Sequence, residues 1–207
     1  MTIPCSAPAR ATHDAYDLDR FVHDVETVLD RRPSVPVTIK EVSSLLGRLV
    51  ADGSWLPDKY RTPIADSYAR YMLHRDRTNR FVVLSLVWLP GQATPIHDHS
   101  AWGAMGIMEN ALEEVAYERL DDGSREGFAE LRETRGRMVG AGSVSYVLPP
   151  YEEVHRIANP TDRPSLSVHV YGRDLDEVNV FDMATKKVSP MRIKYYSPVS
   201  SACDFII

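Results

Sequence analysis

Gly91-Gln92-Ala93-Thr94-Pro95-Ile96-His97-Asp98-His99 is the stretch of sequence that decides the fold and the chemistry expected of this chain. It follows an apolar run, Phe81 to Leu89, that is typical of a buried strand, and Pro90-Gly91 marks a turn between the two. On a second strand, His97 and His99 are two residues apart and therefore point to the same face. Two imidazoles on one rigid face are preset ligands for a divalent metal. We therefore interpret them as part of a metal site and not as two surface histidines.

Composition and charge narrow the possible partners. The 207 residues are 43% hydrophobic and 26% charged, which suits one globular domain. The net charge of −5 disfavours nucleic acid or an anionic membrane as the main partner. No apolar stretch reaches the roughly 20 residues that cross a bilayer. We expect a small-molecule substrate and a monomer or weak homo-oligomer.

The chain ends suggest a reducing compartment. Cys5 and Cys203 lie near opposite ends, which does not indicate a disulfide framework. Residues 1–13 are rich in Pro and Ala and lack the apolar core of a signal peptide. We expect residues 1–13 to form a flexible arm and the protein to be cytoplasmic.

Two amphipathic helices are predicted in residues 14–66, as a segment packed on the rest of the protein. The first starts at Asp14, has apolar residues at three- and four-residue steps, and ends at Arg31-Arg32-Pro33. The second opens at Pro36, since Thr38 and Glu41 have the spacing of a capping box.

Short strands are predicted throughout residues 67–207. They are separated by turn signals such as Asp76-Arg77-Thr78-Asn79 and Asp121-Asp122-Gly123. The expected strands cover residues 68–74, 81–89, 102–108, 112–120, 137–139, 143–148, 155–158 and 165–171, and residues 192–196 are a possible edge strand. This spacing indicates a mainly β fold, an antiparallel β-barrel preceded by two α-helices.

His155 is the natural third ligand, because a barrel can bring the start of its strand opposite His97 and His99. Three neutral imidazoles would leave a divalent ion its charge and its open positions. Zinc in such a site would activate water, whereas Fe(II) would leave positions for a chelating substrate and dioxygen. The possible carboxylate ligands, none of which has a compelling spacing, are Glu109, Glu152 and Glu153.

A second polar constellation lies at Ser167-Val168-His169-Val170-Tyr171. Strand alternation points Ser167, His169 and Tyr171 to one face. Three such groups hydrogen-bonded in series can orient a phenol toward a metal-bound ligand. The alternative is a solvated strand face.

These motifs together resemble the cysteine dioxygenase family of thiol dioxygenases. The resemblance runs from Tyr68-Ala69-Arg70 through Trp88-Leu89-Pro90-Gly91, the two histidines, Trp102-Gly103 and His155 to the Ser-His-Tyr strand. It implies a cupin-fold, non-haem iron enzyme that adds O2 to the sulfur of cysteine.

Carried over by position, the resemblance implies that Fe(II) is bound by His97, His99 and His155. It makes Ser167, His169 and Tyr171 a relay whose tyrosine reaches the substrate and oxygen. Arg70 occupies the position of an arginine that pairs with the substrate carboxylate, and Tyr68 and Trp102 are expected beside it as substrate-binding residues.

The substrate stays open at this point. Members of the family that prefer 3-mercaptopropionate carry glutamine at the Arg70 position and an arginine eight or nine residues past the relay tyrosine, where this chain has Asn179-Val180. A guanidinium pairs with a carboxylate in bidentate fashion and glutamine cannot, so Arg70 favours cysteine. A third possibility is a specialised enzyme that oxidises cysteine or a cysteine-derived thiol beyond the sulfinate.

Two features depart from the family pattern. No cysteine lies near Trp102-Gly103-Ala104 to crosslink with Tyr171, so we expect a free phenol. Met108-Glu109-Asn110-Ala111 replaces a turn that usually contains glycine, and we expect this change to reshape the mouth of the pocket. Tyr195 and Tyr196 either cover the pocket or pack at an edge.

A different class of function is a cupin without redox chemistry, such as a metal-dependent sugar- or amino-acid-binding module or an isomerase. Arg70 and the Ser-His-Tyr strand disfavour this alternative, since an inert binding barrel does not need them.

Overall fold

The computed structural model describes residues 16–150 and 152–197, so the expected arm at residues 1–13 and both cysteines lie outside the described part. Its elements are α1 (Leu18–Asp30), α2 (Val35–Val50), η1 (Asp58–Tyr60), β1 (Ala69–Arg75), β2 (Val82–Trp88), β3 (Ile96–His97), β4 (Gly103–Glu109), β5 (Ala111–Arg119), β6 (Leu131–Gly140), β7 (Val144–Val147), β8 (Val154–Ala158), β9 (Ser165–Tyr171), β10 (Glu177–Asp182) and β11 (Lys187–Arg192). In the described ranges, no helix combines the length and the apolar character that crossing a membrane requires.

Both predicted helices are present, but α2 starts earlier than expected. Asp17 caps α1 by accepting the N–H of Arg20 at 2.9 Å. In α2, Thr38 is buried inside the helix and its hydroxyl donates to the carbonyl of Ser34 at 3.2 Å. The predicted capping box at Thr38 is therefore wrong. Pro36 is the reason, because its fixed φ suits the first turn of a helix that begins at Val35.

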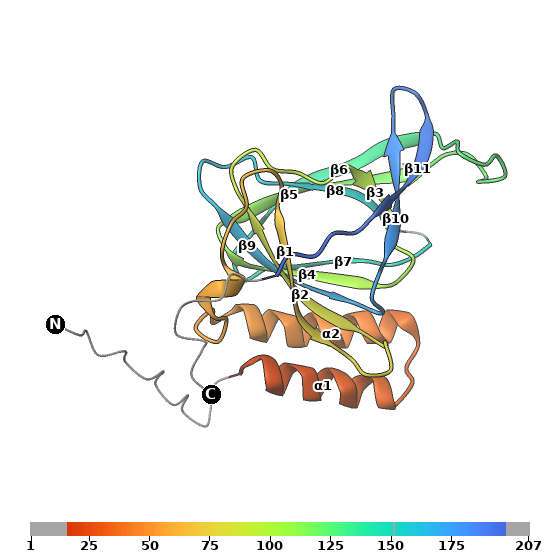
Figure 1. The fold of residues 1–207 in the computed structure, drawn as a ribbon. Coiled ribbons are helices and arrows are strands. Elements are labelled where there is room, and N and C mark those ends of the chain that lie inside the picture. The colour runs from red at the N-terminus through yellow and green to blue at the C-terminus, as the bar shows by residue number, and fades with distance from the viewer. Residues whose placement is uncertain (1–15, 151, 198–207) are drawn as a thin grey trace.

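The strands form two facing sheets, as predicted for a mainly β, cupin-type fold. One sheet has the order β1-β2-β9-β4-β7, and the other has the order β11-β10-β3-β8-β5-β6. Figure 1 shows both helices below the first sheet, covering its outer face. The mainly β fold with two N-terminal helices is confirmed, while the domain boundary expected at residue 67 stays a prediction.

The long apolar run of β2 is explained by burial on both faces. Val83 and Val87 contact the helices, whereas Leu84, Leu86 and Trp88 point into the core between the sheets. A strand with two buried faces reads as a continuous hydrophobic run and loses its polar alternation.

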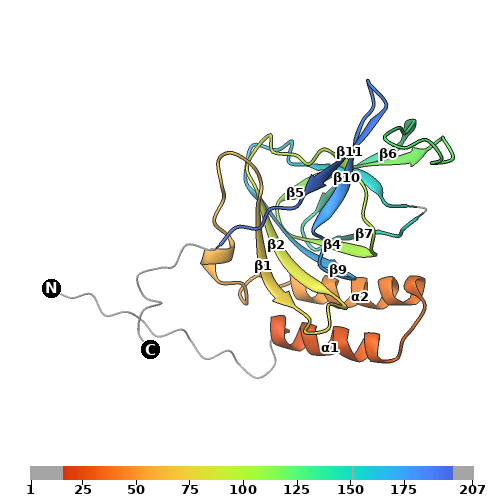
Figure 2. The same cartoon turned by 45° about the vertical axis from the view of Figure 1, so that its right-hand side comes forward.

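The C-terminal strands differ from the prediction. β10 was not predicted, and its partner β11 ends at Arg192, so residues 193–196 are not an edge strand. Ile193 and Tyr196 instead bond to single backbone carbonyls, those of Asp176 and Arg70. Figure 2 shows the blue β10–β11 hairpin projecting past the other strands.

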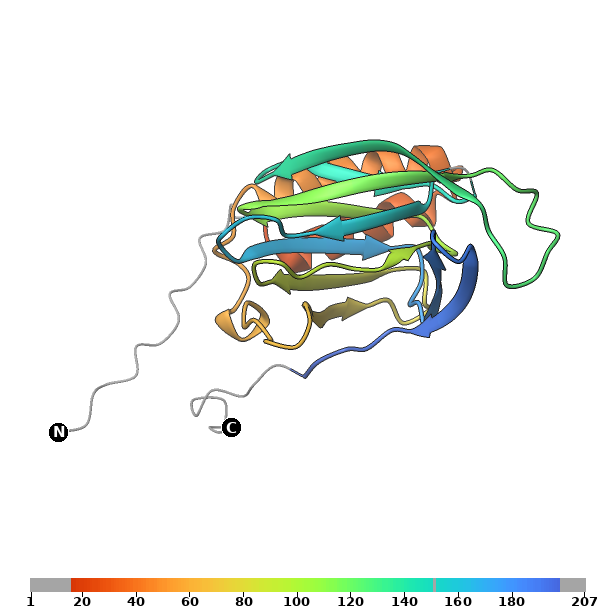
Figure 3. The same ribbon diagram turned by 90° about the horizontal axis from the view of Figure 1, so that it is seen from above.

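Strand β6 is longer than expected, since it covers Leu131–Gly140 where a strand was predicted only over residues 137–139. The predicted turn at Asp121-Asp122-Gly123 belongs to a connection that ends where β6 begins, at Leu131. Seen from above in Figure 3, this green connection extends away from the sheets.

Candidate metal centre and active site

The three predicted ligands converge at one point. His97 in β3 is the register partner of His155 in β8, and His99 follows directly after β3. The ring centroids lie 4.7 to 4.9 Å apart, and one ligand atom from each ring lies within 4.8 Å of the others. All three side chains are buried. Among the described residues, this is the group that could hold a metal ion.

The second ring nitrogen of each histidine faces an acceptor. Nδ1 of His97 lies 3.0 Å from the carbonyl of Pro95, and Nδ1 of His99 lies 3.2 Å from that of Glu153. Nδ1 of His155 lies 3.3 Å from Oε1 of Glu114. Carbonyl and carboxylate oxygens can only accept, so Nδ1 carries the proton in each ring. Nε2 is then the ligand atom, as in metal sites whose histidines are oriented by outer hydrogen bonds.

Glu114, on β5, supplies the one carboxylate of this arrangement. Ser145 donates to it at 2.6 Å, and Nε and Nη2 of Arg137 donate at 3.0 and 2.8 Å. Burial by itself would raise the pKa of Glu114, but the hydrogen bonds from His155, Ser145 and Arg137 lower it to about 2. A permanent negative charge therefore lies behind His155.

The electrostatics keep His97 and His99 neutral. Burial lowers the pKa of His97 to about 3, assisted by His155 and Arg70. Burial also lowers the pKa of His99 well below its ordinary value, assisted by His97 and His155. Neutral imidazoles are the form that binds a metal. The donor set, its tautomers and its burial thus fit a divalent ion.

The predicted polar strand forms a hydrogen-bonded series. Oγ of Ser167 lies 2.9 Å from Nε2 of His169, and Nδ1 of His169 lies 3.1 Å from the hydroxyl of Tyr171. The Tyr171 ring stacks on His99 with centroids 5.4 Å apart, which places this series beside the three histidines. The alternative of a solvated strand face is wrong, because all seven residues of β9 are buried.

Trp88 fixes the direction of the series. Its indole N–H donates to Oγ of Ser167 at 3.0 Å, so the Ser167 proton is directed to Nε2 of His169. His169 then carries its proton on Nδ1 and donates to the Tyr171 oxygen. Burial raises the pKa of Tyr171 to about 12, so its hydroxyl keeps a proton to donate.

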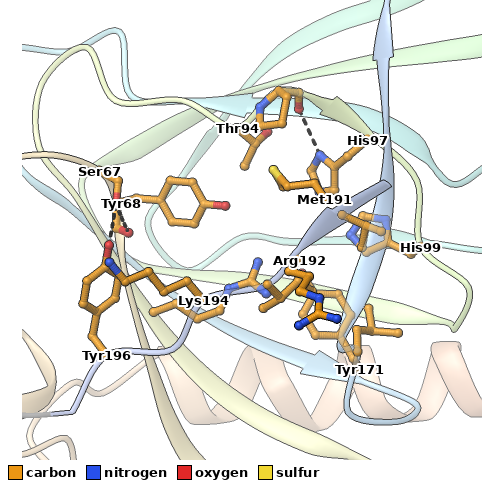
Figure 4. A pocket seen from close by; sticks show the side chains of 15 residues that line it. Ser67, Tyr68, Thr94, His97, His99, Tyr171, Met191, Arg192, Lys194 and Tyr196 are labelled. Atoms are coloured by element: carbon orange, nitrogen blue, oxygen red, sulfur yellow. Dashed lines mark hydrogen bonds between the residues drawn. The ribbon is translucent and has the colours of Figure 1, made fainter. Parts of the chain in front are cut away.

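Arg70 faces a cavity of about 220 Å³ that also reaches His97, His99 and Tyr171. The side chain is 7% exposed, and within residues 16–150 and 152–197 its guanidinium has no ion-pair or hydrogen-bond partner. A buried guanidinium without a carboxylate is costly, so the position suits an anionic ligand. Figure 4 shows this cavity with Tyr68 on one side and the two histidines on the other.

The remaining predicted residues divide into two groups. Tyr68 lines the cavity and stacks on Trp88 with centroids 4.4 Å apart. Trp102 does not line it; a Cβ at Gly172 would lie 2.4 Å from its indole, so the ring covers that glycine instead. The carboxylates proposed as ligands stay outside the metal-binding group: Glu109 pairs with Arg61, Glu152 is exposed, and Glu153 accepts the N–H of His99 at 3.2 Å.

The two departures from the family pattern have local effects. Asn110 adopts a φ of 60°, the left-handed conformation that glycine usually takes, and no residue from Met108 to Ala111 lines the cavity. The expected reshaping of the mouth is therefore wrong. Gly103 contacts the Tyr171 ring so closely that a Cβ there would lie 2.6 Å from it. Tyr196 lines the cavity, whereas Tyr195 packs at its edge and donates to Asp174 at 2.6 Å.

Sequence reasoning missed Glu114, Trp88 and two cavity residues, Arg192 and Lys194. One signal was available for Glu114. It shares a strand face with Leu112, and a carboxylate on a buried face requires partners.

Comparison with known families gives one match that covers most of the chain. The model of the family described as cysteine dioxygenase type I matches residues 21–184. The match begins within α1 and includes α2, the three histidines, Arg70, Glu114 and the Ser-His-Tyr strand, whereas Arg192, Lys194, Tyr195 and Tyr196 lie beyond it.

Several solved structures have a similar arrangement. A protein with a double-stranded β-helix domain from Klebsiella pneumoniae is 16% identical, with 69% of this chain and 100% of that chain covered and a TM-score of 0.42. A cupin 2 conserved barrel domain protein from Salinispora arenicola is 22% identical, with 56% and 84% covered and a TM-score of 0.40. An RmlC-like cupin family protein from Methanocaldococcus jannaschii is 13% identical, with 54% and 85% covered and a TM-score of 0.39.

Proposed function

Because this chain belongs to the cysteine dioxygenase type I family, we propose that it is an Fe(II)-dependent thiol dioxygenase that converts cysteine to cysteine sulfinate. The observation that carries the proposal is the proximity of three groups. Three buried histidines, a buried guanidinium that has no partner among the described residues and a protonated phenol meet beside one cavity.

The donor set supports iron as the resident metal. His97, His99 and His155 bring no negative charge, so a divalent ion keeps open positions for a thiolate and O2. Iron, when bound, supplies the redox chemistry that joins both atoms of O2 to the substrate sulfur. Zinc in the same three ligands would offer only an activated water.

Arg70 supports an amino-acid thiol as the substrate. Its guanidinium can hold the substrate carboxylate in a bidentate pair, which directs the thiol toward the histidines. Asn179 occupies the region where an arginine would favour 3-mercaptopropionate. Its amide donates to Asp98 at 2.9 Å, so that side chain offers nothing to the cavity.

Tyr171 supports a hydrogen-bond donor role toward the oxygen that reacts with the substrate. His169 donates to the phenol oxygen, which leaves the Tyr171 proton free to donate into the cavity. A donor held by two further residues costs no reorganisation when charge develops on oxygen. On the opposite side of the cavity, Tyr68 stacks on Trp88 and forms an aromatic wall that helps to exclude water.

Thiols and Fe(II) both require reducing conditions, so we retain the cytoplasm as the expected compartment, with a monomer or weak homo-oligomer as the expected assembly.

Oxygen uptake tests the proposal. Protein reconstituted anaerobically with Fe(II) is exposed to O2 with L-cysteine or with 3-mercaptopropionate, and product masses are recorded. We expect cysteine to gain two oxygen atoms at one O2 per thiol. Turnover of 3-mercaptopropionate alone would contradict cysteine as the substrate. Oxygen uptake with neither thiol would favour a cupin without redox chemistry.

Replacement of Arg70 tests the role of the guanidinium. Arg70→Gln should raise the KM for cysteine about tenfold to a hundredfold, because a bidentate charge-assisted pair is lost, with unchanged iron content. Arg77→Gln, in the exposed β1–β2 turn, is the matched control. An unaltered KM in the Arg70 variant would contradict the carboxylate assignment.

A further inference from the structure

We infer that the cavity also accepts thiol acids with a second anionic group, and that Arg192 and Lys194 bind this group at the mouth of the cavity. The inference rests on the proposed function and extends its substrate class beyond cysteine. Cysteine would satisfy the histidines and Arg70 alone, whereas a dianionic thiol acid would engage all three cationic side chains.

The cavity wall carries cationic side chains and no carboxylate. Three of its fifteen lining residues, Arg70, Arg192 and Lys194, are cationic, and none is Asp or Glu. The whole protein has the opposite balance, with a net charge of −5. Cations gathered around one cavity repel each other unless an anion neutralises them, and such a cavity concentrates anionic ligands. One carboxylate on Arg70 would leave the two other cations uncompensated.

Lys194 is held beside Arg70 by the segment that follows β11. The backbone N–H of Tyr196 donates to the carbonyl of Arg70 at 2.9 Å, and the Tyr196 hydroxyl lies 2.8 Å from Oγ of Ser67. The Lys194 ammonium lies 4.7 Å from the centroid of the Tyr196 ring. In Figure 4, Lys194 and Arg192 lie between this anchor and the histidines. The segment therefore places both cations at the mouth of the cavity, where they line it and are also exposed to solvent.

Nearby acids do not neutralise these cations. Glu177 is the register partner of Arg192 across β10 and β11, yet no ion pair forms between them. Neither Asp176 nor Glu177 lines the cavity, although both lie close to the outer side of Arg192. Within the described part of the chain, Lys194 also has no carboxylate partner. Both side chains remain available for a ligand.

A pair of thiols that differ by one carboxylate isolates this subsite. Mercaptosuccinate is 3-mercaptopropionate with an added carboxylate, and succinate and propionate are the corresponding acids without sulfur. Binding of succinate and propionate is measured by NMR titration of the zinc-loaded protein, in which no redox chemistry occurs. We expect succinate to bind about tenfold more tightly than propionate. With Fe(II) and O2, kcat/KM for mercaptosuccinate should exceed that for 3-mercaptopropionate by a similar factor.

Variants assign the preference to the two residues. Arg192→Gln combined with Lys194→Gln should reduce both ratios to near one, and Lys194→Glu should disfavour the dicarboxylates by repulsion. Lys187→Gln removes a cation from the far end of β11 and should preserve both ratios. A ratio near one in the unmodified protein, or a ratio that survives the double substitution, would overturn the inference.

The two proposals fail separately. If cysteine is oxidised but dicarboxylates bind no better than monocarboxylates, the subsite for a second anionic group is refuted and the proposed dioxygenase reaction is retained. If succinate binds more tightly than propionate through Arg192 and Lys194 but no thiol consumes O2, the subsite is retained and the proposed reaction is refuted.

Discussion

Glu114 gives the neutral histidine site a charge that the ligands themselves lack. Its carboxylate accepts the Nδ1 proton of His155 and is held in turn by Ser145 and Arg137. A buried carboxylate behind a histidine fixes the ring orientation and increases its basicity. A metal held by the three histidines would therefore feel this charge through His155, and Glu114 itself would not be a ligand.

Glu114→Gln should weaken metal binding about tenfold to a hundredfold, because an amide keeps the shape of the side chain but not its charge. Competition with a chelator measures the dissociation constant. Glu113→Gln is the matched control. Glu113 is the neighbour of Glu114 in the sequence, and it points away from the site to form an ion pair with Arg156 at 3.6 Å. Equal metal affinity in the two variants would leave Glu114 a purely structural role.

Tyr171→Phe should lower kcat about a hundredfold, the usual cost of removing one preorganised donor to a developing negative charge. Metal content should not change, because the phenol is not among the three ligands. Tyr146→Phe removes a hydroxyl from a side chain that is 50% exposed and serves as the control. A kcat close to that of the unmodified enzyme would rule out the donor role.

At the scale of elements, the β1–β2 turn joins the strand that carries Arg70 to β2, which pairs with β9, the strand of the Ser-His-Tyr series. The buried carboxylate of Asp76 accepts the backbone N–H groups of Thr78 and Arg80, each at 3.0 Å. It also accepts the Thr78 hydroxyl at 2.6 Å and forms an ion pair with Arg80 at 3.0 Å. Hydrogen bonds from Arg80 and Thr78 hold the pKa of Asp76 far below its ordinary value, against the effect of burial.

Asp76→Asn should lower the free energy of unfolding by about 1–3 kcal/mol at pH 7, because donors are left without their charged acceptor. The unfolded Asp76 binds a proton below about pH 4 while the folded one does not, so its contribution is lost as the pH falls. The difference between the unmodified protein and the variant should therefore shrink below pH 4. Denaturant unfolding at both pH values measures this, with the exposed Asp162→Asn as control.

At the scale of the whole molecule, the two sheets contribute different parts of the site. The β3–β8 pair of the six-stranded sheet carries His97 and His155, whereas β1 and β9 of the five-stranded sheet carry Arg70 and Tyr171. The proposed metal ligands and the proposed substrate contacts therefore meet only when both sheets are packed together.

Metal binding should stabilise the folded protein, because the unfolded chain does not hold the three histidines together. At a hundredfold excess over the dissociation constant the gain is about 2.7 kcal/mol, or roughly 5–10 °C in Tm for a protein of this size. Thermal unfolding with and without a chelator measures the shift. His155→Ala should abolish it, and His23→Ala, on the exposed face of α1, should preserve it. A shift that persists in the His155 variant would exclude that residue as a ligand.

The sequence by itself determined what depends on local periodicity. A period of two put Ser167, His169 and Tyr171 on one face of β9, and three- and four-residue steps located both helices. The motif around His97 and His99 predicted two of the three histidines that the fold brings together, and His155 was predicted as the third.

Only the tertiary structure decided which separate elements meet. The register of β3 on β8 sets His97 opposite His155, and the packing of β5 behind β8 brings Glu114 to His155. Likewise, the segment after β11 leaves its strand to reach Arg70, which places Lys194 over the cavity, while Trp102 packs on Gly172 instead. These contacts join residues far apart in the chain, and their geometry depends on strand pairing and loop paths that no local pattern encodes.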